Sequence, residues 1–141
     1  MLELFVIIVV VGVLASIAIP GYQNAVQKAK VATAVSDILK ISLQIQRYNT
    51  LNYTLPATLA DIHMDTLLDP WGNPYQYLSF TGLKGKGKMR KDKNLVPINT
   101  QFDLYSMGAD GKSAPPLTAA ASRDDIVMAN DGSYVGLASD Y

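Results

Sequence analysis

An uncharged apolar run near the N-terminus constrains this chain more than any other feature. Residues 4–19 read LFVIIVVVGVLASIAI, and no side chain between Glu3 and Lys28 carries a charge. At about 1.5 Å per residue, a helix of this length spans a hydrocarbon core of about 30 Å. The run has neither a basic segment before it nor a small-residue cleavage pattern, so a retained signal peptide fits it poorly. We therefore expect a membrane-length helix.

Glu3, the only glutamate in the chain, lies at the edge of this apolar run. A carboxylate near lipid is costly unless it reaches the headgroups or acquires a partner. Two interpretations stay open. The side chain extends to the interface, or the N-terminal amine of a neighbouring copy neutralises it.

The helical pattern continues well beyond the apolar run. Pro20 removes one backbone hydrogen bond from a helix and Gly12 weakens the turn around it, so we expect a kink, or unwinding between these residues, once copies pack together. Beyond Tyr22, apolar residues recur every three or four positions, which predicts one buried face of a helix that ends near Asn49 or Asn52. The apolar positions are Val31, Val35, Ile38, Ile41, Ile45 and Tyr48.

Composition suits one small domain attached to one anchor. The 141 residues include no cysteine, which excludes a disulfide framework. The net charge is zero, so no overall electrostatic field favours nucleic acid, and we do not expect it as a partner. The pattern predicts a helical turn at residues 58–62 and strands at 75–78, 95–98, 102–107 and 134–137. Proline and glycine residues predict turns at 68–74 and 108–111.

The charges are unevenly distributed along the chain. Residues 82–94, the basic loop, carry six basic side chains and one aspartate, whereas residues 100–141 contain six aspartates. The loop is either solvated and without a partner, or it docks on an acidic neighbour, a phosphate-rich polymer or anionic lipid. Pairing with the acidic segment of another copy is one such contact. The candidate interaction residues are Lys84, Lys86, Lys88, Arg90, Lys91 and Lys93.

The sequence contains no recognisable catalytic arrangement, and we expect no enzyme. His63 is the only histidine, no nucleophile elbow is present, and a surface or capping position suits it best. The Asp- and Gly-rich segment 108–126, the acidic loop, is more informative. Calcium takes six to eight oxygen ligands, and Asp110, Asp124 and Asp125 supply such oxygens if the loop folds back. The spacing is not that of an EF-hand.

Two stretches resemble a known family. Met1 to Phe5, the aliphatic run, Gly12 and the string Ala18–Tyr22 resemble the N-terminal segment of type IV pilins and type II secretion pseudopilins. There a leader is removed, the new N-terminus is methylated, and a glutamate occupies the fifth mature position. Glu3 matches that glutamate if two residues precede Met1. Gly12 and Pro20 are displaced from the family's glycine and proline by the same two positions.

The second stretch, Asp69-Pro-Trp-Gly-Asn-Pro-Tyr75, resembles an element of the type II secretion major pseudopilin. We expect Asp69 to cap this turn and Trp71 to cover the helix. The resemblance also extends to the acidic loop. It implies calcium held by the side chains of Asp110, Asp124 and Asp125, with carbonyls near Met107 and Lys112, although the loop is several residues longer than is usual for the family.

The resemblance implies an α+β fold: a long kinked N-terminal helix packed on a small antiparallel sheet, with an aspartate-rich C-terminal loop. We expect an apolar filament-core half at 1–27, an amphipathic half at 28–52, and a globular head at 53–141. The implied function is polymerisation into a filament, most simply as a major pseudopilin. The alternatives are the major pilin of a long surface fibre and, outside the family, a monomeric membrane-tethered binding domain.

The same resemblance implies the partners and the location. The chain would form a homopolymer after meeting a prepilin peptidase and an inner-membrane assembly platform. It would be a single-pass protein of the bacterial inner membrane before assembly, and then part of a periplasmic or cell-surface filament.

Overall fold

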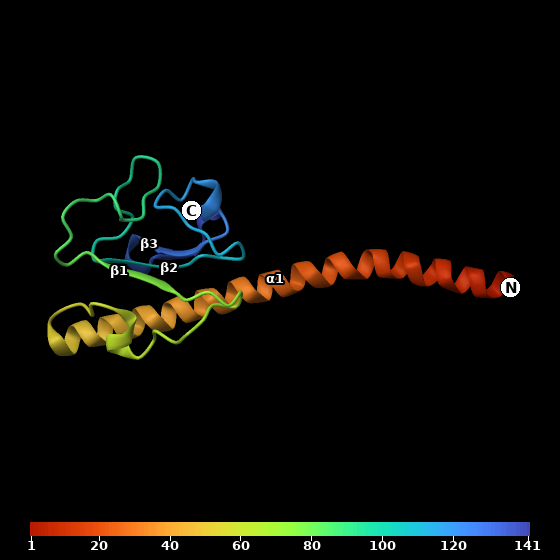
Figure 1. Cartoon of the computed structure of the whole chain (residues 1–141), viewed down its shortest axis with the longest axis horizontal. Helices are drawn as coiled ribbons and strands as arrows, with labels where there is room; N and C mark the ends of the chain where they lie inside the picture. The colour runs from red at the N-terminus through yellow and green to blue at the C-terminus, as the bar shows by residue number, and fades with distance from the viewer. The chain divides into compact units, whose positions relative to one another are not determined.

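The computed structural model describes all 141 residues and begins with one long helix (Figure 1). Helix α1 runs without interruption from Leu2 to Asn52. The chain divides into two compact units, Met1–Lys30 and Val31–Tyr141, so the second part of α1 belongs to the head. The predicted C-terminal end of the helix at Asn52 is confirmed.

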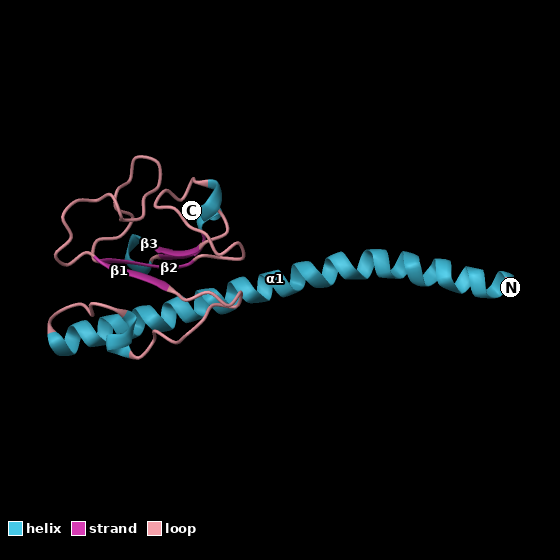
Figure 2. Cartoon of the chain, in the orientation of Figure 1, coloured by secondary structure: helices cyan, strands magenta, loops and turns pink.

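Four short strands form the only sheet, shown in magenta in Figure 2. Every neighbouring pair is antiparallel, and the spatial order β1-β2-β3-β4 follows the chain. The strands are β1 (Gln76–Ser79), β2 (Phe102–Ser106), β3 (Ile126–Ala129) and β4 (Tyr134–Leu137). Short 3-10 turns are η1 (Leu59–Ile62), η2 (Ala120–Ser122), η3 (Asn130–Gly132) and η4 (Ala138–Asp140).

One face of the sheet packs on the second part of α1. Ile38, Ile41 and Ile45 are fully buried there, as the three- and four-residue spacing predicted. Alternate residues of a strand point to opposite faces of the sheet, so every second strand residue faces α1. The three isoleucines form one core with these strand side chains. The strand residues of this core are Phe102, Leu104, Ile126 and Met128. Trp71 packs against the same cluster, as expected.

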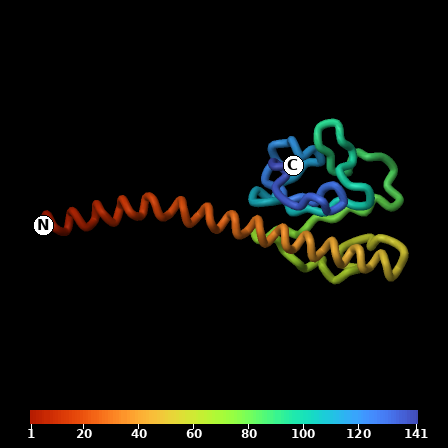
Figure 3. Tube along the Cα trace, turned by 180° about the vertical axis from the view of Figure 1, so that it is seen from behind, coloured from red at the N-terminus to blue at the C-terminus, as the bar shows by residue number.

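The opposite face of the sheet is also covered. Val127 and Ala129 of β3 belong to a second core cluster with Ile98, Leu117 and Ala138. The loop from β1 to β2 lies on this side of the sheet, away from α1, in both Figure 1 and Figure 3. The head therefore has a helix on one face and long loops on the other.

Most of the predicted elements are present, with two exceptions. Residues 95–98 form no strand: the Ile98 amide bonds to the Arg90 carbonyl at 3.1 Å, and the Asn130 amide bonds to the Ile98 carbonyl at 3.0 Å. The prediction of a strand there was wrong. Strand β3 was missed because its four residues are all buried, so the alternation that marks a half-exposed strand is absent.

Gly12 and Pro20 both lie inside the unbroken helix. Pro20 has no amide hydrogen to donate to the preceding turn, which weakens the helix locally without ending it. Unwinding of this stretch among packed copies stays a prediction.

Candidate functional site

Within the unit Met1–Lys30, residues 4–19 present an uncharged and almost entirely apolar surface. Large side chains from Leu2 to Ile19 are each about half exposed or more, such as Phe5 at 66% and Ile17 at 71%. By length and composition the helix is able to cross a membrane. An apolar surface this extended marks a contact with lipid or with other protein chains.

The three predicted assembly residues lie on this helix. Glu3 is exposed in the first turn, and the three ion pairs of the chain do not include it. A Cβ atom at Gly12 would meet nothing within 4 Å, so no contact of the single chain requires glycine there. Small residues let the backbones of neighbouring helices approach closely, and Gly12 offers such a place.

In the head, Asp69 organises the turn of the Asp-Pro-Trp-Gly string and joins it to β2. Its Oδ1 accepts the amide hydrogens of Trp71 at 3.0 Å and Asn73 at 2.8 Å, which confirms the predicted cap. Its Oδ2 accepts a hydrogen bond from the Ser106 hydroxyl at 2.5 Å. Asn73 then donates to the Gly108 carbonyl at 3.1 Å. The turn thereby holds the beginning of the acidic loop.

The acidic loop folds back so that Asp110 lies beside Asp124. The Asp110 amide donates to Asp124 Oδ2 at 2.9 Å, and Asp110 Oδ1 accepts the Lys112 amide at 2.7 Å. Gly108 makes this approach possible. Its φ is +66°, and a Cβ atom there would lie 2.2 Å from the Asp124 carbonyl oxygen.

Asp125 points to a different set of partners. Its carboxylate is fully buried, and Oδ2 accepts hydrogen bonds from Arg90 Nη2 at 2.5 Å and from the Ser113 hydroxyl at 2.6 Å. Burial raises the pKa of the Asp125 carboxyl, an effect that the Ser113 hydroxyl and the Arg90 guanidinium oppose. Arg90 and Asp125 form an ion pair inside the head.

This arrangement fits calcium poorly. Calcium needs six to eight oxygen ligands, but no group of three acidic or histidine side chains is arranged to hold a metal ion. Asp110 and Asp124 each engage a backbone amide, and the third carboxylate faces a guanidinium. The carbonyls of Met107 and Lys112 were assigned only from the family. Calcium in the acidic loop stays a prediction that the geometry of Asp125 weakens.

The basic loop is not uniformly a surface element. Lys84, Lys86 and Lys88 are exposed, and the Lys86 ammonium donates to the Val96 carbonyl at 3.2 Å. Arg90, by contrast, was predicted to be a surface interaction residue, but it is only 3% exposed. Its charge therefore lies inside the head. The signal in the sequence was the adjacent Met89, an apolar residue in a lysine-rich run, which is also buried.

The end of the basic loop is fixed by its backbone. The Lys91 amide bonds to the Pro115 carbonyl at 3.0 Å, and the Leu117 amide bonds to the Lys91 carbonyl at 2.9 Å. Lys93 lies 4.0 Å from Asp92 in a weak exposed ion pair. The C-terminal part of the basic loop is thus attached to the acidic loop.

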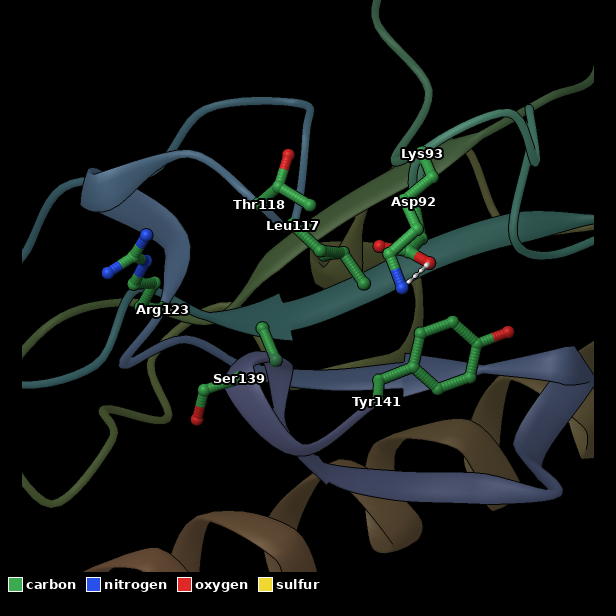
Figure 4. A pocket seen from close by; sticks show the side chains of 8 residues that line it. Asp92, Lys93, Leu117, Thr118, Arg123, Ser139 and Tyr141 are labelled. Carbon is green, nitrogen blue, oxygen red and sulfur yellow. Dashed lines mark ion pairs between the residues drawn. The ribbon is translucent and has the colours of Figure 1, made fainter.

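A cavity of ≈ 390 Å³ lies where the basic loop meets the C-terminal segment (Figure 4). Arg123 and Tyr141 stand at opposite sides of it, and the Lys93–Asp92 pair lies at its edge. His63 is not part of this lining. It is exposed at the C-terminal cap of η1, the capping position that was predicted.

A membrane-length helix continued into a head with a four-stranded antiparallel sheet defines a pilin-like structural subunit. The chain is 32% identical to a type II secretion system core protein G of Pseudomonas aeruginosa over 133 residues, covering 79% of this chain and 82% of that protein. It is 31% identical to the protein of that name from Aeromonas hydrophila, covering 89% and 87%. The corresponding protein of Vibrio cholerae is 29% identical, with 85% of both chains covered.

The chain belongs to the type II secretion system core protein G family. No family model matches it, and no solved structure matches it. The expected relationship to type II secretion pseudopilins is thereby confirmed.

Proposed function

We propose that this chain polymerises through its N-terminal helix into the pseudopilus of a type II secretion system. The observation that carries this proposal is the apolar surface of residues 4–19, which the rest of the chain does not cover. Packing identical helices together keeps these side chains in a dry environment and adds van der Waals contacts that lipid makes less well.

Glu3 and Gly12 give the packing its direction. An unpaired carboxylate in an apolar layer gains from an amine supplied by the next subunit. The open space at Gly12 allows a neighbouring helix to approach. Such a contact joins two different surfaces, and its repetition by a screw operation produces an open fibre rather than a closed ring.

The proposed path begins in the bacterial inner membrane, where the helix crosses the bilayer once. A prepilin peptidase would process the chain there, and an inner-membrane platform would extract it into a periplasmic filament. The names of the relatives, all core proteins of secretion systems, support this path. The subunit itself needs no bond-making step.

Disulfide crosslinking in cells tests the polymer directly. The chain has no cysteine, so Leu14→Cys with Ser16→Cys introduces the only reactive thiols. We expect a ladder of multimers, since both positions lie on the apolar helix. Glu3→Gln in the same background should shorten the ladder at unchanged protein level. A monomeric tethered domain predicts single chains only, and that result would overturn the proposal.

A long surface fibre is the second candidate, because the basic loop of residues 82–94 exposes Lys84, Lys86 and Lys88 on the head, outside the apolar helix. Electron microscopy of cells that overproduce the chain separates the two. Short or absent external filaments favour the pseudopilus, and long external fibres favour a surface pilus.

A further inference from the structure

The buried carboxylate of Asp125 requires a positive partner. Asp125 is 0% exposed and immediately precedes β3, so its position is fixed by the start of a central strand. A charge that is buried without compensation strongly destabilises a fold. The residue that supplies the compensation comes from the basic loop, 35 positions away along the chain.

Arg90 is held at its backbone and at its guanidinium group. Its amide donates to Asp103 Oδ2 at 2.6 Å, and its guanidinium carbon lies 4.2 Å from the centroid of the Tyr105 ring. Asp103 and Tyr105 are alternate residues of β2, so both face the side of the sheet that the loops cover. The guanidinium is therefore clamped between a strand and the acidic loop, as a cation stacked on an aromatic ring.

The far end of Arg90 satisfies three groups of the acidic loop. Nη2 pairs with Asp125, while Nη1 donates to the Ser113 hydroxyl and to the Ala114 carbonyl at 2.8 Å. The two buried polar atoms that lack a partner, Arg90 Nε and Asp125 Oδ1, belong to this same pair. A single bond, from Nη2 to Oδ2, joins the guanidinium to the carboxylate, while Nη1 serves Ser113 and Ala114. Lysine has no planar fork with which to reach these groups together.

We infer that Arg90 is a built-in counter-ion that joins the basic loop to the acidic loop and replaces a divalent cation at Asp125. A dication beside this carboxylate would lie next to a guanidinium and be repelled by it. Removing Asp125 from the predicted calcium ligands leaves Asp110 and Asp124, which already accept backbone hydrogen bonds. The head thus closes its C-terminal loop with a side chain of its own. This pairing holds whether or not the chain polymerises.

Thermal unfolding of the full chain in detergent micelles, followed by circular dichroism, tests the inference. The wild-type midpoint should be the same with excess chelator and with millimolar calcium. Arg90→Gln should lower the midpoint by about 10 °C in both conditions, because it leaves a buried carboxylate unpaired. Lys88→Gln, an exposed neighbour in the same loop, is the matched control and should leave the midpoint unchanged. A wild-type midpoint that falls on chelation, or an Arg90→Gln midpoint equal to wild type, would overturn the inference.

Direct calcium titration of the wild-type chain keeps the test decisive if Arg90→Gln does not fold. Isothermal titration calorimetry with calcium chloride should give no saturable heat at concentrations up to about 1 mM, within the range of weak extracellular calcium sites. Saturable binding that Asp125→Asn abolishes would contradict the inference. In a double-mutant cycle, Arg90→Gln combined with Asp125→Asn should lower the midpoint by less than the sum of the two single changes. Additive effects would likewise contradict it.

Discussion

The hydroxyl of Tyr75 donates a hydrogen bond of 3.1 Å to Asp37 Oδ2, across 38 positions of the chain. This bond joins the end of the Asp-Pro-Trp-Gly string to the buried face of α1. The Lys40 ammonium approaches the other oxygen of Asp37 at 3.0 Å. Burial and the neighbouring Asp37 carboxylate raise the pKa of Tyr75 well above its ordinary range, so the hydroxyl stays a donor.

Tyr75→Phe should lower the free energy of unfolding by about 1–2 kcal/mol, because the Asp37 carboxylate loses a donor inside the head. Chemical denaturation monitored by Trp71 fluorescence measures the change. Tyr53→Phe provides the control, since Tyr53 is 94% exposed and its hydroxyl makes no hydrogen bond within the chain. Equal stabilities of the two variants would show that the bond contributes nothing.

Gly108→Ala should destabilise the head by more than about 3 kcal/mol, since it combines a positive φ with a clash against the Asp124 backbone. Gly82→Ala separates the two effects. Gly82 also has a positive φ, of +77°, but a Cβ atom there meets nothing within 4 Å. Gly82→Ala should therefore lower the free energy of unfolding by only about 1 kcal/mol. Chemical denaturation of both variants measures the two losses of stability. If Gly108→Ala and Gly82→Ala lost similar amounts, the predicted clash would be contradicted.

Acidification should favour the folded head through Asp103. Burial raises the pKa of this carboxyl above its ordinary value, and hydrogen bonds from the Arg90 amide and the Asn99 side chain oppose the effect without cancelling it. The folded state therefore binds this proton more readily than the unfolded state. The contribution of Asp103 to stability increases as pH falls through its folded-state pKa and levels off below the unfolded value near 3.8.

The measurement is the free energy of unfolding of wild type and Asp103→Asn at about pH 7 and at about pH 5, roughly one pH unit above the pKa of an ordinary aspartate. The free energy of unfolding of wild type, relative to that of Asp103→Asn, should be larger at the lower pH. A constant difference would mean that Asp103 titrates alike in both states.

Replacing Lys84, Lys86 and Lys88 together by Gln should weaken filament assembly at low salt and have a smaller effect at high salt. These three side chains are exposed, and interactions between exposed charges are screened over about 10 Å at 0.1 M ionic strength. Sedimentation of assembled material at the two salt concentrations measures the effect. Assembly that is indifferent to the triple change would assign these lysines to a solvated loop.

The helix and most of the sheet were predictable because their signals are local. The spacing of Ile38, Ile41 and Ile45 specifies a buried helical face, and the alternation in β2 specifies a strand with two environments. Asp69 was predictable as a cap, since a carboxylate ahead of Pro-Trp-Gly suits a turn.

The Arg90–Asp125 pair was not predictable, because it depends on the arrangement of distant segments. A basic run is ordinarily a solvated surface, and nothing local distinguishes Arg90 from its lysine neighbours except Met89. Strand β3 was not predicted from the sequence for a related reason. The loops cover its second face, so Val127 and Ala129 are as buried as Ile126 and Met128, and the pattern of a buried strand resembles any short apolar run.

Met89 and Arg90 divide their loop into two parts with different tolerance to change. Insertions or deletions among residues 82–88 would leave the packing of the head intact, because Lys84, Lys86 and Lys88 are exposed. From Met89 to Ile98 the chain is constrained: Met89 packs in the head, Arg90 pairs with Asp125, and the backbone of Lys91 and Ile98 is hydrogen-bonded. A residue added in this segment would displace the guanidinium from Asp125. Variation in length is therefore expected to concentrate ahead of Met89.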